Sequence, residues 1–276
     1  MQNQNKFHYK AMMFLSFAGP AVILFSAVVI VPFIFGLYLT FTGWDGISSS
    51  IPFVGFENYL SLFKDTSFWI SLGRTILYAV IAVILANVVA FALAYLVTSK
   101  IKGSNFFRAA FFTPNLIGGI VLGYIWQFVF KQAILVIGKS TGISLFSTSW
   151  LSDPFKAFWA LIIVTVWQLS GYLMLIYIAG LMGVSDDLKE AAKIDGCDEK
   201  KTTRYITLPM MAGTFTICFF LAITRAFVTY DVNISLTEGG PFGSTTLAAM
   251  YVYNMAFSSK KYGLGQAEAL ILFLVI

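Results

Sequence analysis

The chain has 276 residues, of which 58% are hydrophobic, 17% aromatic and only 11% charged, with a net charge of +5. A soluble domain carries about a quarter of charged residues, so this composition excludes that class and indicates a protein that crosses a membrane several times. The small and dispersed positive charge gives no support to nucleic-acid binding.

The first predicted span runs from Ala11 to about Phe41 and follows a tail that contains Lys6, His8 and Lys10. A basic start before an apolar run is also typical of a cleavable signal peptide. This run, however, is long enough to cross a hydrocarbon layer of about 30 Å with tilt, and no small-residue cleavage site follows it. We therefore predict a retained membrane helix, with His8 in a solvated tail and not a metal ligand.

A polar loop from Gly43 to Ser71 is predicted on the outer side, with Trp44 and Trp69 as interfacial anchors. Later spans are predicted at about residues 72–97, 106–130, 155–182 and 206–230, with a loop at 131–153. Residues 264–276 begin a sixth span, which needs residues beyond position 276 to cross a bilayer.

Two short features support this arrangement. The dense basic turn with Lys100, Lys102 and Arg108 is predicted to lie inside, because cytoplasmic loops are enriched in basic residues. Gly119 and Gly123, four residues apart in an apolar helix, permit close contact with a neighbouring helix.

The longest polar stretch runs from Val184 to Met211 and predicts a helix, a sharp turn and a second helix that Pro209 kinks. Ser185 or Asp186 is predicted to cap the first helix, Gly196 to end it, and Asp198 to cap the second helix. A small apolar face with Ala191 and Ala192 lies among charges of both signs. This face suits a groove on a partner protein, with Glu190 holding a basic residue, although a solvated hairpin between two spans has the same composition.

The spacing within this stretch resembles the signature loop of permease subunits of bacterial ATP-binding-cassette importers. A Glu-Ala-Ala triplet is followed after three residues by a glycine, and after nine more by Ile-x-Leu-Pro. The resemblance implies that the loop 184–209 docks on a cytoplasmic ATPase. The coupling residues that it implies are Glu190, Ala191, Ala192, Asp195, Gly196, Ile206, Leu208 and Pro209.

Positions elsewhere in the chain are similar to the carbohydrate-importer branch of these permeases. They are Val54, Gly55, Glu57, Asn58, Tyr59, Phe107, Arg108, Pro114 and Trp167, with further matches between Tyr230 and Phe257. The resemblance implies uptake of mono- or oligosaccharides, with glycerol phosphate, a polyol or an anionic sugar as alternatives. The turn of Gly239, Gly240 and Pro241 is expected to meet a sugar-binding protein on the outer surface, or to be only a rigid connection.

The same resemblance implies the fold and the assembly. We expect an all-α inner-membrane bundle with the importer type I permease fold and six transmembrane helices, divided into residues 1–70 and a permease core at 71–276. A second homologous permease, two ATPase subunits and an extracytoplasmic solute-binding protein are the implied partners, within the lipid of a bacterial inner membrane. ATP and magnesium belong to the ATPase subunits, and this chain is expected to bind no cofactor, metal or nucleic acid.

Polar groups inside predicted spans are candidates for the substrate pathway, since such groups usually face a water-filled cavity or a partner. Sugars are bound through hydroxyl hydrogen bonds and aromatic faces, which selects Gln168, Ser170, Tyr172, Arg225, Phe227 and Tyr230. Arg225 either donates into this pathway or extends to the outer surface.

Two other function classes are disfavoured. An ion-coupled secondary transporter needs an acidic residue at mid-depth, and the predicted spans hold only Glu268 near an outer end. A membrane enzyme needs a cluster of His, Cys or carboxylate groups near one interface, and the sequence shows none. The segment with Gly138 lacks the first glycine of a nucleotide-binding loop.

Overall fold

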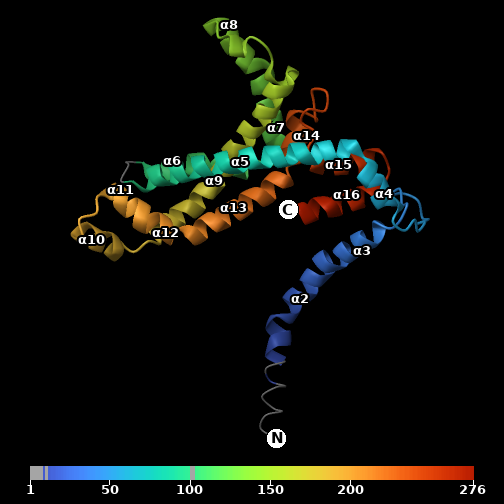
Figure 1. Cartoon of the computed structure of the whole chain (residues 1–276), viewed down its shortest axis with the longest axis horizontal. Coiled ribbons are helices and arrows are strands. Elements are labelled where there is room, and N and C mark those ends of the chain that lie inside the picture. Colours follow the sequence, from blue (N-terminus) through green and yellow to red (C-terminus); the bar gives the residue numbers. More distant parts are fainter. Residues whose placement is uncertain (1–8, 10–11, 100–102) are drawn as a thin grey trace. The chain divides into compact units, whose positions relative to one another are not determined.

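The computed structural model describes residues 9, 12–99 and 103–276, and this part of the chain is mostly helical (Figure 1). Its extended segments pair once, in an isolated antiparallel bridge between Thr42 and Phe53. Several residues with predicted roles lie outside the described residues: Lys6, His8, Lys10, Lys100 and Lys102.

The chain divides into two compact units, each described here by itself. The first contains Met1–Thr66 with Val252–Val275, and the second contains Ser67–Tyr251 with Ile276. The sequence-based boundary at residue 70 stays a prediction. That prediction assigns the C-terminal segment to the permease core, whereas the structure groups Val252–Val275 with the first unit.

The first unit is built on the predicted first span, which is an apolar helix over Gly19–Leu39. Asn58 closes its C-terminal end, because the side-chain amide donates at 2.8 Å to the carbonyl groups of both Thr40 and Thr42. Carbonyl groups at a helix end have no partner within the helix, so this contact fixes the turn. The helices are α2 (Gly19–Phe25), π-helical η1 (Ser26–Ile30), α3 (Val31–Leu39), α4 (Glu57–Lys64), π-helical η6 (Asn254–Ser258) and α16 (Tyr262–Val275).

The second unit consists of long apolar helices joined by shorter helices and loops. Its first elements are α5 (Thr66–Thr98), α6 (Ser104–Leu116), α7 (Gly119–Phe128), π-helical η2 (Val129–Ala133), α8 (Ile134–Thr141), and the 3-10 turns η3 (Ser144–Phe146) and η4 (Trp150–Ser152). They are followed by α9 (Pro154–Met182), α10 (Asp186–Ile194), α11 (Glu199–Thr202), π-helical η5 (Thr203–Thr207), α12 (Leu208–Met210), α13 (Ala212–Phe227) and α14 (Asp231–Leu236). Helix α15 (Ala248–Tyr253) leads into the first unit.

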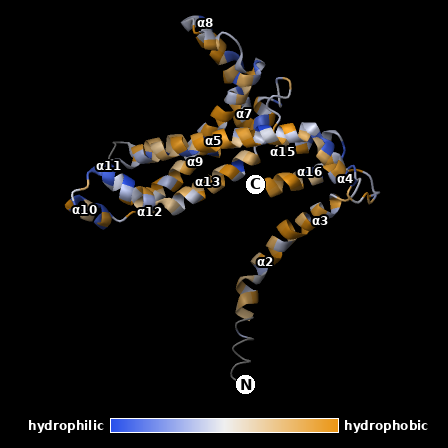
Figure 2. Ribbon diagram, in the orientation of Figure 1, coloured by the Kyte–Doolittle hydropathy of each residue, from blue (hydrophilic) through white to orange (hydrophobic). Residues whose placement is uncertain are grey.

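The predicted second and fourth spans are confirmed as α5 and α9, with 33 and 29 residues. Figure 2 shows both helices as mostly hydrophobic, whereas hydrophilic residues gather at α11. By length and composition, four helices among the described residues can cross a membrane. A fifth span results if the segment α11–α12 and helix α13, which are bent relative to each other, are taken as one span. Helix α16 is apolar but shorter, so the number of six spans stays a prediction.

The predicted third span is wrong as a single helix from 106 to 130. Helix α6 ends at Leu116 and α7 begins at Gly119, and the long apolar helix is Gly119–Thr141 instead. Pro114 donates no backbone hydrogen bond and Gly118 is a poor helix former, which favours a break at this point. The helix therefore continues through much of the segment predicted as a loop at 131–153.

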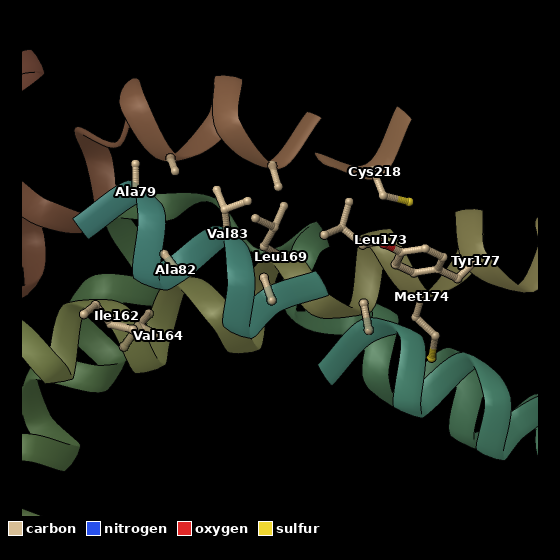
Figure 3. Packing of buried hydrophobic residues seen from close by; sticks show 14 of the residues in the cluster. Ala79, Ala82, Val83, Ile162, Val164, Leu169, Leu173, Met174, Tyr177 and Cys218 are labelled. Carbon is tan, nitrogen blue, oxygen red and sulfur yellow. The ribbon is translucent and has the colours of Figure 1, made fainter. Parts of the chain in front are cut away.

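A stripe of small residues on α5 allows the helices of the second unit to pack closely. Ala79, Ala82, Ala86, Ala90 and Ala94 follow each other at three- or four-residue intervals, and all are buried. Figure 3 shows the first two in the same hydrophobic cluster as Ile162 and Val164 of α9 and Cys218 of α13. Small residues at such an interface let helix backbones approach, which favours van der Waals contact within a membrane.

The predicted close contact at the two α7 glycines is confirmed. A Cβ atom on Gly119 would lie 2.7 Å from the Cβ of Asp231, and one on Gly123 would lie 1.9 Å from Ser235 Oγ. Both neighbours belong to α14. The two glycines therefore seat α14 directly against the backbone of α7.

Candidate functional site

The caps predicted for the first polar helix are present. Ser185 caps α10, and its hydroxyl accepts from the amide two residues later at 3.2 Å. Gly196 adopts the left-handed conformation with φ of 84°, and the amide of Cys197 donates to the carbonyl of Ala192 at 2.9 Å. A left-handed residue after the last turn is the usual way to end a helix, and glycine adopts it without strain.

The second helix begins and bends as predicted. Asp198 caps α11 by accepting from the amide of Lys201 at 2.7 Å. The path continues through η5 and α12, and it bends by 64° between Glu199–Met210 and α13. Pro209 lies in the last short turn before this bend, where its missing donor weakens the helix.

The apolar face of α10 differs from the predicted one. Ala192 and Val184 are each only 4% exposed, whereas Ala191 is exposed. Adjacent residues of a helix point about 100° apart, so the two alanines do not share one face. The outward apolar surface is formed instead by Ala191, Leu188 at 42% exposure and Ile194 at 87%.

Charged residues surround this outward surface. Glu190 is exposed, and Lys189 forms an ion pair with Asp186 at 2.9 Å. The hydrogen bond from Lys189 holds the pKa of the Asp186 carboxyl below its usual range. Of the other predicted coupling residues, Asp195, Gly196 and Pro209 are exposed, and Ile206 and Leu208 are half-buried.

A cavity of about 630 Å³ lies behind α10 and shows which helix ends meet there. Its lining includes Thr98 and Ser99 at the end of α5, Met182 at the end of α9, and Lys193 on α10. The loop with the two capped helices therefore lies at the C-terminal ends of α5 and α9.

A second cavity, of about 470 Å³, lies where α7, α9, α13 and α14 meet, and we call it the solute cavity. Its lining residues are Gly119, Thr165, Gln168, Leu169, Arg225, Val228, Thr229, Tyr230, Asp231 and Val232. The polar atoms on its wall include amide, hydroxyl, guanidinium and carboxylate groups, which are the groups that bind polyhydroxylated solutes.

Two neighbours hold the guanidinium of Arg225 at this cavity. One guanidinium nitrogen donates to Asn115 Oδ1 at 3.0 Å, and the guanidinium carbon lies 4.8 Å from the ring centroid of Tyr172. Both contacts are of the kind that orient an arginine. Arg225 is also exposed, so donation into the pathway and extension to the outer surface both stay predictions for this residue.

The predicted pathway residues divide into two groups. Gln168, Arg225 and Tyr230 line the solute cavity, and Tyr172 contacts Arg225. Ser170 lies instead on a separate apolar cavity, and Phe227 packs against the hydrophobic core. Residues two apart in a helix point about 200° apart, so Ser170 turns away from the face of Gln168, and Phe227 from that of Arg225.

Sequence reasoning missed several residues of this site. Asn115 follows Pro114 at the end of α6, and Thr229 and Asp231 flank the turn between α13 and α14. The stretch from Tyr230 onward carries a family resemblance, but the pattern does not indicate which of its side chains face inward.

The segment after α14 forms a second structured surface, which we call the α14–α15 loop (residues 237–247). Asn233 on α14 donates to the carbonyl of Thr245 at 2.9 Å, and Thr245 Oγ1 donates to the carbonyl of Gly240 at 2.8 Å. Of the predicted contact residues, Gly239 is buried, and Gly240 and Pro241 are half-buried. The residue after them, Phe242, is exposed.

Comparison with known proteins assigns the family. Residues 86–276 match the family described as the binding-protein-dependent transport system inner membrane component. The chain belongs to this family. As an inner membrane component with several apolar helices, it is a multi-pass membrane subunit of a binding-protein-dependent transport system.

Relatives of this inner membrane component carry transport names. It is 40% identical over 276 residues to the probable starch degradation products transport system permease protein AmyD of Thermoanaerobacterium thermosulfurigenes, covering 100% of this chain and 94% of that one. It is 34% identical over 245 residues to the multiple sugar-binding transport system permease protein MsmF of Streptococcus mutans, covering 89% and 84%.

Solved structures show the same fold. A chain from a bacterial ABC transporter for import of the acidic polysaccharide alginate superposes with a TM-score of 0.83 at 18% identity, covering 99% of this chain and 94% of that one. A chain from the bacterial alginate transporter in complex with an alginate pentasaccharide-bound periplasmic protein gives a TM-score of 0.82 at 17% identity, covering 98% and 92%. The all-helical importer permease fold expected from the sequence is thereby confirmed.

Proposed function

We propose that this inner membrane component is the transmembrane permease subunit of an ATP-driven importer of mono- or oligosaccharides. The observation that carries the proposal is the solute cavity, in which Gln168, Thr165 and Thr229 present hydrogen-bonding groups at the junction of four helices. The transport names of its relatives, which include starch degradation products and multiple sugars, support the same substrate class.

The lining of the cavity favours a neutral sugar. Arg225 brings one positive charge and Asp231 brings one negative charge, so the two offset each other. The Gln168 amide nitrogen donates to the carbonyl of Ile117, and the Thr229 hydroxyl donates to that of Arg225. Their side-chain oxygens can still accept from sugar hydroxyls, and Tyr230 offers an aromatic side chain.

An anionic saccharide is the second candidate, because Arg225 places an exposed guanidinium at this cavity. Guanidinium binds carboxylate with two parallel hydrogen bonds, and such a contact would require it to leave Asn115 or to share it. Glycerol phosphate and polyols are the remaining alternatives within the same transport class.

The energy for transport comes from partner subunits in this proposal. Two ATPase subunits bind ATP and magnesium on the cytoplasmic side of a bacterial inner membrane, and a second homologous permease completes the pathway. The outward surface of α10, with Ala191, Leu188 and Ile194, enters a groove of an ATPase, and Glu190 pairs with a basic residue there. Closure of the ATPases moves the two capped helices and exposes the solute cavity alternately to the two sides.

Uptake by the assembled transporter in liposomes tests the coupling. Glu190→Lys should lower ATP-driven uptake of a labelled maltooligosaccharide by at least about tenfold, since reversing a paired interface charge costs several kcal/mol. Lys200→Glu, an exposed charge reversal on α11, is the matched control and should leave uptake near that of the wild type. Full uptake by Glu190→Lys would refute the docking role of α10.

Substrate charge is tested at Arg225. With Arg225→Gln, uptake of an anionic oligosaccharide should fall selectively if the second candidate is correct, whereas a comparable loss for neutral and anionic oligosaccharides excludes it. Transport by the isolated chain under an ion gradient, without ATPase subunits, would contradict the proposed function itself.

A further inference from the structure

Phe242 at the tip of the α14–α15 loop is the most exposed large hydrophobic side chain among the described residues, at 95%. Its backbone has a φ of 54°, in the left-handed region that a bulky residue rarely adopts. An aromatic ring held in water on a strained backbone gains nothing from contacts within its own chain. Exposed aromatic residues of this kind are typical anchors of protein interfaces.

The loop that carries Phe242 is held in one conformation. The Arg74 side chain donates to the carbonyl of Gly243, and Thr245 Oγ1 donates to the carbonyl of Gly240 and lies 2.8 Å from the hydroxyl oxygen of Thr237. These bonds fix the backbone on both sides of the ring. A side chain presented by a preorganised loop loses little conformational freedom on binding, which favours affinity.

The loop lies on the far side of the membrane from α10. Arg74 contacts the loop, whereas Thr98, 24 positions later in the same helix, lines the cavity behind α10. At 1.5 Å per residue these two positions are about 36 Å apart, which exceeds a hydrocarbon thickness of about 30 Å. In Figure 1 the loop after α14 projects beside α7, well away from α10. In a binding-protein-dependent system, the partner on this side is the solute-binding protein.

The loop is connected directly to the solute cavity. Asn233, fully buried on α14, donates to the loop carbonyl of Thr245, and Asp231 at the start of the same short helix lines the cavity. Helix α14 lies against the α7 backbone at Gly119 and Gly123 without intervening side chains. A force on the loop therefore acts on α14, and hence on one wall of the cavity.

We infer that Phe242 inserts into an apolar pocket of the extracytoplasmic solute-binding protein, and that the α14–α15 loop and α14 transmit this docking to the wall of the solute cavity. The inference rests on the proposed function for its partner. It assigns the contact to Phe242 and not to the neighbouring glycines and proline.

Site-specific photo-crosslinking identifies the partner of the ring. A benzophenone side chain is introduced at position 242 of the full transporter in its native membrane, and adducts are identified by mass spectrometry. The expected adduct is the solute-binding protein. The matched control is Phe220, 67% exposed on α13, which should give no adduct with that protein. An adduct of position 242 with lipid or with the second permease overturns the inference.

A binding measurement tests the contribution of the ring. The solute-binding protein that copurifies with the wild-type transporter is labelled and titrated against the transporter in nanodiscs. Phe242→Ala should raise the Kd by about 10-fold to 100-fold, the factor for losing one buried aromatic side chain, and Phe242→Leu should restore part of the affinity. An unchanged Kd for Phe242→Ala overturns the inference.

The ATPase assay separates docking from folding and from the proposed function. Basal ATPase activity of the Phe242→Ala transporter should match the wild type, whereas stimulation should need about tenfold more binding protein. Loss of basal activity with an unchanged Kd would show a structural role instead. If the wild-type transporter moves no sugar but still binds its partner through position 242, the sugar assignment fails and the docking inference stands.

Discussion

Replacing Gly123 by alanine should force α14 away from α7. The new Cβ would lie 1.9 Å from Ser235 Oγ, 2.8 Å from Ser235 Cβ and 3.1 Å from the backbone nitrogen of Leu236. Rotation of the serine hydroxyl relieves only the first of these contacts. Inserting a methyl group into such a packed site typically costs about 1–3 kcal/mol, against a gain of about 1 kcal/mol in helix propensity.

A double-mutant cycle isolates the steric cost. Ser235→Gly removes the two side-chain atoms that clash, so Gly123→Ala should be tolerated better in that background. The propensity contributions are the same on both sides of the cycle and cancel, which leaves a coupling energy of about 1–3 kcal/mol. The free energy of unfolding is measured on the purified protein in mixed micelles with increasing SDS, and uptake is measured in parallel.

A control at Gly73 defines the baseline. A Cβ on this α5 residue meets no atom within 4 Å, so Gly73→Ala should leave stability and uptake unchanged or slightly improved, and it should be additive with Ser235→Gly. Additivity of Gly123→Ala and Ser235→Gly within about 0.5 kcal/mol would refute the close contact of α7 and α14.

Three further predictions concern other parts of the chain. Gly171→Ala should destabilise α9 against α6 by about 1–3 kcal/mol in the same unfolding assay, because its Cβ would lie 1.9 Å from the backbone oxygen of Phe111; a neutral result would contradict that packing. Asp198→Ala should cost α11 about 1 kcal/mol by removing its cap from the amide of Lys201, seen as faster amide exchange in α11 and not in α10. Two backbone amides of its own turn lower the pKa of Asp45, so this turn should be fully formed above the ordinary carboxyl pKa and lost as the pH falls through the lowered value. Amide exchange corrected for its intrinsic pH dependence reports this, and protection that rises on acidification would contradict the sign.

The elements predicted well are those with local causes. Helices α5 and α9 end close to the expected residues because long apolar windows define them, and the caps at Ser185 and Asp198 follow from side chains that bond their own next turn. The glycine pair of α7 was also recognisable, since four-residue spacing of glycines has a direct packing meaning.

The elements predicted poorly depend on contacts between distant segments. Pro114 and Gly118 favour the break before α7, but neither residue requires it, and the polar residues Lys131 and Lys139 hide the extension of the helix to Thr141. The directions in which the side chains of Ser170 and Phe227 leave their helices were not predicted, because polarity and aromaticity alone do not specify a helix face. The exposure of Phe242 is set by the surrounding loop bonds, which only the folded chain reveals.

The 64° bend between the α11–α12 segment and α13 determines the direction in which movement is passed on. A displacement along the first arm projects onto the axis of α13 by less than half of its length, and the larger part acts across that axis. In the proposed coupling, a push from an ATPase along the first arm would therefore displace the near end of α13 mostly sideways, and only to a lesser extent along its axis.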